Sequence, residues 1–178
     1  MHRLIPALIA TALSACSTDG IVVTREQAIV PDVEIHLRYL GSLGSVPTSV
    51  LANPFPQDSD GEAVRRVLSD TPVRPHLRYS AAPVNDPSGY RMVVAFGRWP
   101  VGGDSYCRNS GLTPLPAPMD TTAMHIVLCF GTATLAESAG HTGRIAAPDD
   151  PRLARLINDL LVALMLSPQR NNLESPAF

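Results

Sequence analysis

The sequence contains no lysine, and all fourteen of its basic residues are arginine. Together with 17 prolines and 12 glycines, this usage indicates a GC-rich coding bias, so the arginine count says little about function. The net charge is −2, and no basic run extends beyond Arg65-Arg66. The chain therefore lacks the positive footprint of a nucleic-acid-binding protein. Aromatic residues are also scarce, at 5%, which argues against a carbohydrate groove lined with aromatic rings.

Familiar catalytic motifs are missing as well. The chain has no G-x-S-x-G elbow, no P-loop and no H-E-x-x-H pattern. Gly103-Asp104-Ser105 resembles the motif of GDS-type hydrolases, but that family has the motif near the mature N-terminus and an Asp-x-x-His, which this chain lacks. We interpret the motif as a turn and keep a small envelope hydrolase that uses the Asp104–Cys107 loop as an alternative. The sequence thus assigns no catalytic residue and no cofactor.

The apolar run at the N-terminus is short. It covers ten residues, Leu4 to Leu13, after Arg3, whereas a helix that spans a bilayer needs roughly 20 apolar residues. A charged start, a short apolar segment and small residues at the end predict a secretory signal that is removed after export.

The end of this run, Leu13-Ser14-Ala15-Cys16, resembles the lipobox of bacterial lipoproteins. The resemblance implies that the Cys16 thiol carries a diacylglycerol, that the signal is cut before this residue and that the new amino group is acylated. Two or three acyl chains anchor a protein durably, whereas one holds it only marginally. Ser17 in place of an aspartate favours the outer membrane in enterobacterial lipoproteins, with the protein facing the periplasm.

The rest of the chain reads as one domain. We expect a signal peptide over residues 1–15, a tether over 16–20, a single domain over 21–168 and a loose tail over 169–178. The expected elements are strands over 21–30, 33–40, 74–81, 90–97 and 124–131, a loop over 41–57, a helix capped by Ser59 or Asp60, and a further strand and hairpin after Gly131.

The clearest element is the last helix, which begins at Pro151 and ends before Pro168. Its leucine stripe, including Leu156, Leu160 and Leu164, predicts burial against large residues of the strand over 124–131, namely Met124, Ile126, Leu128 or Phe130. This order of elements predicts an α+β fold, an antiparallel sheet with two helices packed on one face.

The tetrapeptide His-Leu-Arg-Tyr occurs twice, at 36–39 and 76–79. We interpret both copies as strands rather than as a structural repeat. His36, His76 and His125 could then converge from neighbouring strands on a metal ion, but no pair has tight ligand spacing, and we assign no metal site.

Two cysteines remain once Cys16 is lipidated. In an oxidising compartment such a pair is usually a disulfide, so we predict a Cys107–Cys129 bond that tethers the long Gly- and Pro-rich segment between the two central strands. The alternative is a buried free Cys129 and an exposed Cys107.

The element order resembles that of small α+β envelope lipoproteins, such as those of lipopolysaccharide assembly and of envelope ABC transporters. The strand Tyr90–Phe96 (Y-R-x-V-x-x-F) resembles uncharacterised alphaproteobacterial lipoproteins. These resemblances imply a non-catalytic accessory protein that binds an unidentified envelope protein and is held to the membrane by its lipid. A lipoprotein that binds a small ligand between sheet and helices is the third interpretation.

Overall fold

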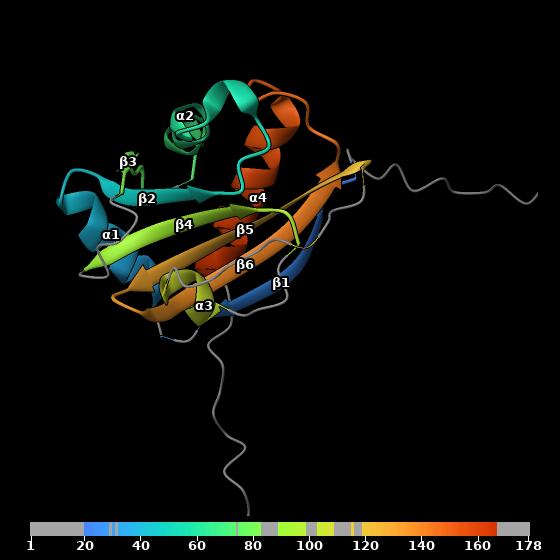
Figure 1. Ribbon diagram of the computed structural model, residues 1–178. Helices are drawn as coiled ribbons and strands as arrows, with labels where there is room; N and C mark the ends of the chain where they lie inside the picture. The colour runs from blue at the N-terminus through green and yellow to red at the C-terminus, as the bar shows by residue number, and fades with distance from the viewer. Residues whose placement is uncertain are drawn as a thin grey trace, which may run out of the picture.

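The computed structural model describes residues 20–28, 30, 32–73, 75–82, 89–98, 103–108, 115 and 119–166. Six strands form one sheet in the order β1-β6-β5-β4-β2-β3 (Figure 1). The strands are β1 (Val22–Ala28), β2 (Val46–Leu51), β3 (Tyr79–Ala81), β4 (Tyr90–Phe96), β5 (Thr121–Phe130) and β6 (Ala133–Gly143). The helices are α1 (Val33–Ser42), α2 (Glu62–Asp70), α3 (Gly103–Arg108) and α4 (Pro151–Leu166), with a short 3-10 turn over Pro56–Asp58.

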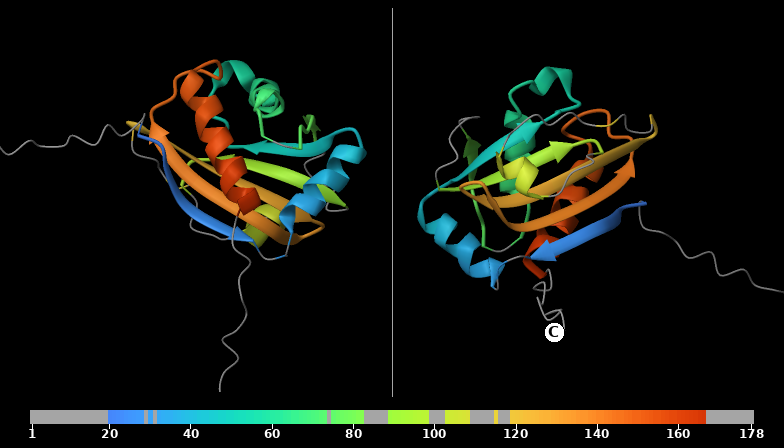
Figure 2. Two further views of the ribbon diagram at one scale, coloured as in Figure 1. Left: turned by 180° about the vertical axis from the view of Figure 1, so that it is seen from behind. Right: turned by 60° about the horizontal axis from the view of Figure 1, so that its bottom comes forward.

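Both faces of the sheet carry buried side chains. α1, α2 and α4 share one hydrophobic cluster with the large residues of β4 and β5, including Met92, Phe96 and Ile126. α3 lies on the opposite face (Figure 1) and forms a smaller cluster there. In the view from behind in Figure 2, α4 crosses the helix-covered face of the sheet and α1 lies beside it.

The α+β class and the central pairing of the predicted strands are confirmed. β4 and β5 are antiparallel, with Val94 opposite Ile126, and β5 and β6 form a hairpin. The sheet is nevertheless mixed, because β2 runs parallel to both β3 and β4. Three helices, rather than two, contribute to the larger cluster, and a fourth lies on the other face.

Three local predictions were wrong. Residues 33–40 form α1 and not a strand, because Val33, Leu37 and Leu40 are buried at helical spacing. β2 lies within the segment that we predicted to be a loop. Its Pro47 is opposite Ser80 of the three-residue strand β3. Residues 103–108 form a helix rather than a turn.

The predicted helix near Asp60 is confirmed as α2, although Gly61 is its N-cap residue. The buried carboxylate of Asp58 accepts the Ala63 and Val64 amide hydrogens at 2.7 and 3.2 Å. These bonds satisfy amides that the first helical turn leaves without partners. The last helix is also confirmed, with Leu156, Leu160 and Leu164 fully buried.

The predicted signal peptide and most of the tether precede the described residues, and the predicted tail lies after them. Among the described residues, no helix is both long and apolar enough to cross a membrane.

Candidate functional site

The α3 face of the sheet is built from smaller side chains than the helix-covered face. Val93, Ala95, Val127 and Cys129 of the sheet are buried there together with Tyr106 and Cys107 of α3. Cys107 in α3 and Cys129 in β5 form a disulfide, with their Cα atoms 5.6 Å apart. The predicted bond is therefore present in the structure, and it holds α3 against the sheet.

The hydrolase motif lies on this face at the start of α3. The Asp104 carboxylate accepts the Thr134 amide hydrogen at 3.0 Å and lies 3.8 Å from the Arg108 guanidinium. No hydrogen bond joins Ser105 to a histidine within the described part of the chain. A serine nucleophile needs such a base, so the arrangement of Asp104 is that of a structural contact between α3 and β6.

Gly103 allows α3 to approach β6 closely. A Cβ atom at this position would lie 2.5 Å from the Thr134 side chain and 2.8 Å from Oε2 of Glu137. Glu137 is only 5% exposed and lies at this contact. Its carboxylate is thus covered by α3 rather than presented on the open part of the face.

Beyond α3 the same face is hollowed. The hollow has a volume of about 460 Å³ and is lined by Thr24, Arg98, Thr121, Ala123, His125, Ala139, Gly140 and His141. These residues come from β1, β5, β6 and the end of β4. Small residues form its floor, and two histidines and an arginine supply its charge-bearing groups. The hollow is therefore a polar site on the described part of this face.

Strand register brings the two histidines together. His141 is opposite Ala123 and His125 is opposite Ala139 on the β5–β6 hairpin, which makes the histidines diagonal neighbours on one face, with Cα atoms roughly 7–8 Å apart. The His125 ring also lies against Tyr106, with 5.4 Å between ring centroids. The side chain of His125 is therefore positioned by α3 as well as by its own strand.

The three histidines considered from the sequence do not converge. His36 lies on α1, where its Nδ1 is 2.9 Å from the Tyr90 hydroxyl, and His76 is exposed in the segment before β3. Only His125 reaches the hollow. Among the described residues there is no cluster of three metal-ligating side chains.

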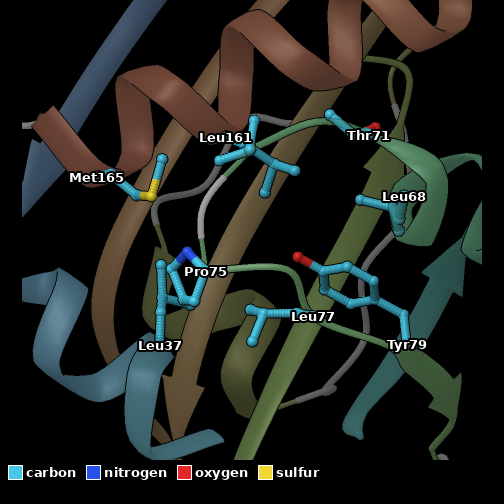
Figure 3. A pocket seen from close by; sticks show the side chains of 9 residues that line it. Leu37, Leu68, Thr71, Pro75, Leu77, Tyr79, Leu161 and Met165 are labelled. Atoms are coloured by element: carbon cyan, nitrogen blue, oxygen red, sulfur yellow. The ribbon is translucent and has the colours of Figure 1, made fainter. Parts of the chain in front are cut away.

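A second cavity lies between the helices and is nearly filled. Its volume is about 10 Å³, and its lining includes Leu37, Leu68, Leu77, Leu161 and Met165 (Figure 3). That is about the space of one water molecule. The cavity is therefore too small for the ligand that we considered between sheet and helices.

One polar side chain reaches into this cavity. Figure 3 shows the Tyr79 ring directed between the surrounding apolar side chains. Burial raises the pKa of the Tyr79 phenol well above its ordinary value, because the phenolate would lose hydration there.

An apolar surface occupies the other end of the sheet. We call it the α1 surface; it comprises Ile35, Tyr39 and Leu43 with Phe130, whose exposed fractions are 63, 52, 58 and 51%. Tyr90 links its aromatic members, with ring centroids 5.7 Å from Tyr39 and 4.8 Å from Phe130. Exposed aromatic and aliphatic residues that gather in this way are typical of protein interaction sites.

Sequence reasoning missed both the hollow and the α1 surface. The sequence does not pair His141 with His125, because a register shift between Leu128 and Cys129 lies between the turn at Gly131 and the histidines. The α1 surface was missed because residues 33–40 were interpreted as a strand, in which Ile35 and Tyr39 both fall on the half-buried face.

No family model and no curated protein sequence matches the chain. Two solved structures of the PelC dodecamer from Paraburkholderia phytofirmans are similar to it, with identities of 12 and 13% and TM-scores of 0.40 and 0.43. The similarity covers 82 and 84% of this chain and 97 and 99% of the PelC chains. At these values the likeness is distant.

Proposed function

We propose that this protein is a lipid-anchored accessory protein of the bacterial envelope, faces the periplasm and binds a protein partner without catalysing a reaction. The observation that carries the proposal is the sequence Leu13-Ser14-Ala15-Cys16 after a short apolar run. The Cys107–Cys129 disulfide supports it, because such bonds persist in oxidising compartments and are rare in the cytosol.

The anchor is tested at Cys16. In the Cys16→Ser variant we expect an uncleaved precursor that no longer incorporates labelled fatty acid, whereas the wild type is cleaved and labelled. A matched Cys107→Ser variant should still be labelled, because its N-terminus is intact. Normal maturation of the Cys16→Ser protein would contradict lipid anchoring and the outer-membrane location that depends on it.

The α1 surface is the proposed site for the partner. The chain enters the fold at Val22, opposite His141, whereas Phe130 lies at the far end of β5. Six residues from Cys16 to Val22 reach at most about 20 Å, so an anchor there leaves the α1 surface at the end away from the bilayer. A protein, rather than lipid, is the occupant that this placement supports.

Site-specific photocrosslinking tests this surface. A photoreactive residue at Tyr39 should give one defined adduct with an envelope protein, identified by mass spectrometry, and Leu43→Asp should abolish it. The same photoreactive residue at Arg66, which is exposed on α2, should give no such adduct. Adducts only with lipid, or only with a second copy of this chain, would overturn the assignment.

The hydrolase alternative has no specific observation in its favour. Asp104 is engaged with Thr134, and Ser105 has no histidine bonded to it in the part of the chain that the structure describes. Partner binding therefore stands as the single proposed function.

A further inference from the structure

We infer that the hollow on the α3 face, lined by Arg98, His125 and His141, binds the phosphate group of a small molecule or lipid headgroup. The charge of the hollow has one sign. Its described lining holds one permanent cation and two imidazoles, and none of these described residues is a carboxylate. An anion placed there would meet hydrogen-bond donors without a competing negative group in the lining.

Two acidic residues near the hollow, Glu137 and Asp120, are not among the described residues that line it. Glu137 is buried under α3 at Gly103. Asp120, at the rim, accepts a hydrogen bond from the Thr121 hydroxyl at 3.1 Å and is next to Arg144, whose backbone amide bonds the Asp120 carbonyl oxygen. Among the described residues that line the hollow, Arg98 is thus the one with a permanent charge.

The geometry favours a tetrahedral oxyanion. The three donors come from neighbouring parts of the sheet, because His125 lies on β5, His141 lies on β6 and Arg98 follows the end of β4. A phosphate presents oxygens in several directions at once, whereas a carboxylate presents two in one plane. Arg98 is the strongest of these donors, since the guanidinium fork pairs well with phosphate oxygens.

The floor of the hollow leaves room for this group. Ala123 and Ala139 are the residues between the histidines, and their methyl groups fill little of the space. Thr24, at the irregular register of β1, is held by a bond from its hydroxyl to the Ala139 carbonyl oxygen at 3.2 Å. The hollow is thus wide enough at 460 Å³ for a phosphate with a small organic substituent.

Two sources could supply the phosphate. A free phosphate ester needs only access to the face. A lipid headgroup could bind only if the hollow lies close to a membrane. This second source rests on the proposed lipid anchor, because the chain enters the fold at Val22, which lies opposite His141 at the same end of the sheet. The two sources share one recognition chemistry, so the first experiment addresses that chemistry alone.

The probe is inorganic phosphate, added to the chain from Ser17 onward, which contains the whole described fold and is exported with a cleavable signal so that its disulfide forms. Histidine ring resonances are followed by NMR at constant pH. We expect saturable shifts for His125 and His141 and none for His76, which is exposed outside the hollow. Arg98→Ala should weaken binding about tenfold, which corresponds to ~1.4 kcal/mol, and Arg66→Ala should not change it.

Three outcomes would contradict a phosphate site in the hollow. Equal shifts with sodium chloride at matched ionic strength, equal movement of His76, or unchanged affinity in Arg98→Ala would overturn the site. His125→Gln and His141→Gln serve as second variants, each expected to weaken binding. This unanchored protein needs no lipid on Cys16, so failure here is distinct from failure of the proposed function.

Vesicles then separate the sources. Sedimentation with phosphatidylglycerol vesicles that depends on Arg98 supports a headgroup, and phosphate binding without sedimentation supports a free ester. Sedimentation that persists in Arg98→Ala, together with no response to inorganic phosphate, would indicate general membrane adhesion and overturn the inference.

Discussion

The two faces of the sheet are stabilised in different ways. The face covered by α1, α2 and α4 buries large aliphatic and aromatic side chains in one cluster, whereas the α3 face has a small cluster fastened by a disulfide. A covalent link needs little buried area, and the α3 face carries the hollow lined by Arg98, His125 and His141 beside that link. The comparison shows stability concentrated on one face and accessible polar chemistry on the other.

The largest effect should come from the helix-covered face. Leu160→Ala removes a side chain with no exposed surface and should lower the free energy of unfolding by about 2–5 kcal/mol. Val162→Ala, on the exposed side of the same helix, should change it by less than about 0.5 kcal/mol. Urea unfolding followed by circular dichroism measures both, and equal losses would contradict a core role for this stripe.

On the α3 face the disulfide should dominate. Replacing Cys107 and Cys129 together by alanine opens a loop with a sequence separation of 22 and should cost about 3 kcal/mol. The loss should disappear when both proteins are compared under reducing conditions. A difference that survives reduction would show that side-chain packing, and not the covalent link, holds α3 in place.

A smaller effect is expected where α3 meets β6. Gly103→Ala introduces a methyl group against Thr134 and Glu137 and should cost about 1–3 kcal/mol through overpacking. Gly41→Ala meets only the tip of Leu77, at 3.1 Å, and serves as the comparison within a helix. Thermal unfolding of the two variants measures the difference, and a neutral Gly103→Ala would mean that α3 can shift.

The smallest effect concerns alkaline pH. Burial raises the pKa of Tyr79, so the unfolded chain releases this proton at a lower pH than the folded protein does. Stability should therefore fall as the pH rises above about 10, by at most about 1.4 kcal/mol per pH unit. The Tyr79→Phe variant has no phenol to titrate, so its unfolding free energy should fall less steeply with pH than that of the wild type. The same pH dependence in both proteins would show that the Tyr79 hydroxyl is hydrated in the folded state.

The two His-Leu-Arg-Tyr segments show why the sequence predicted some elements and not others. Residues 36–39 lie in α1, whereas residues 76–78 have no regular secondary structure and lead into β3 at Tyr79. Val33, Ile35, Leu37 and Tyr39 alternate as in a strand, but Val33, Leu37 and Leu40 also fit a helix. Packing against the core decides between two patterns that the local sequence satisfies equally.

Strong local patterns were sufficient elsewhere. The leucine stripe of α4 fits only a helix, and the alternating residues of β4 and β5 fit only strands. The structure contains this helix and these two paired strands. β2 was hidden by Pro47 and by a parallel pairing that no local signal encodes. The hollow could not be predicted because its residues come from four segments brought together only by strand register.

The pairing of β1 with β6 has a consequence for assembly. The first strand is hydrogen-bonded only to the last one, with Ala28 opposite Ala136 and Val22 opposite His141. Contacts so distant in the chain form late, because loop closure must precede them. β1 therefore stays unpaired until β6 is available, so the edge of the sheet is completed only after most of the chain has been synthesised.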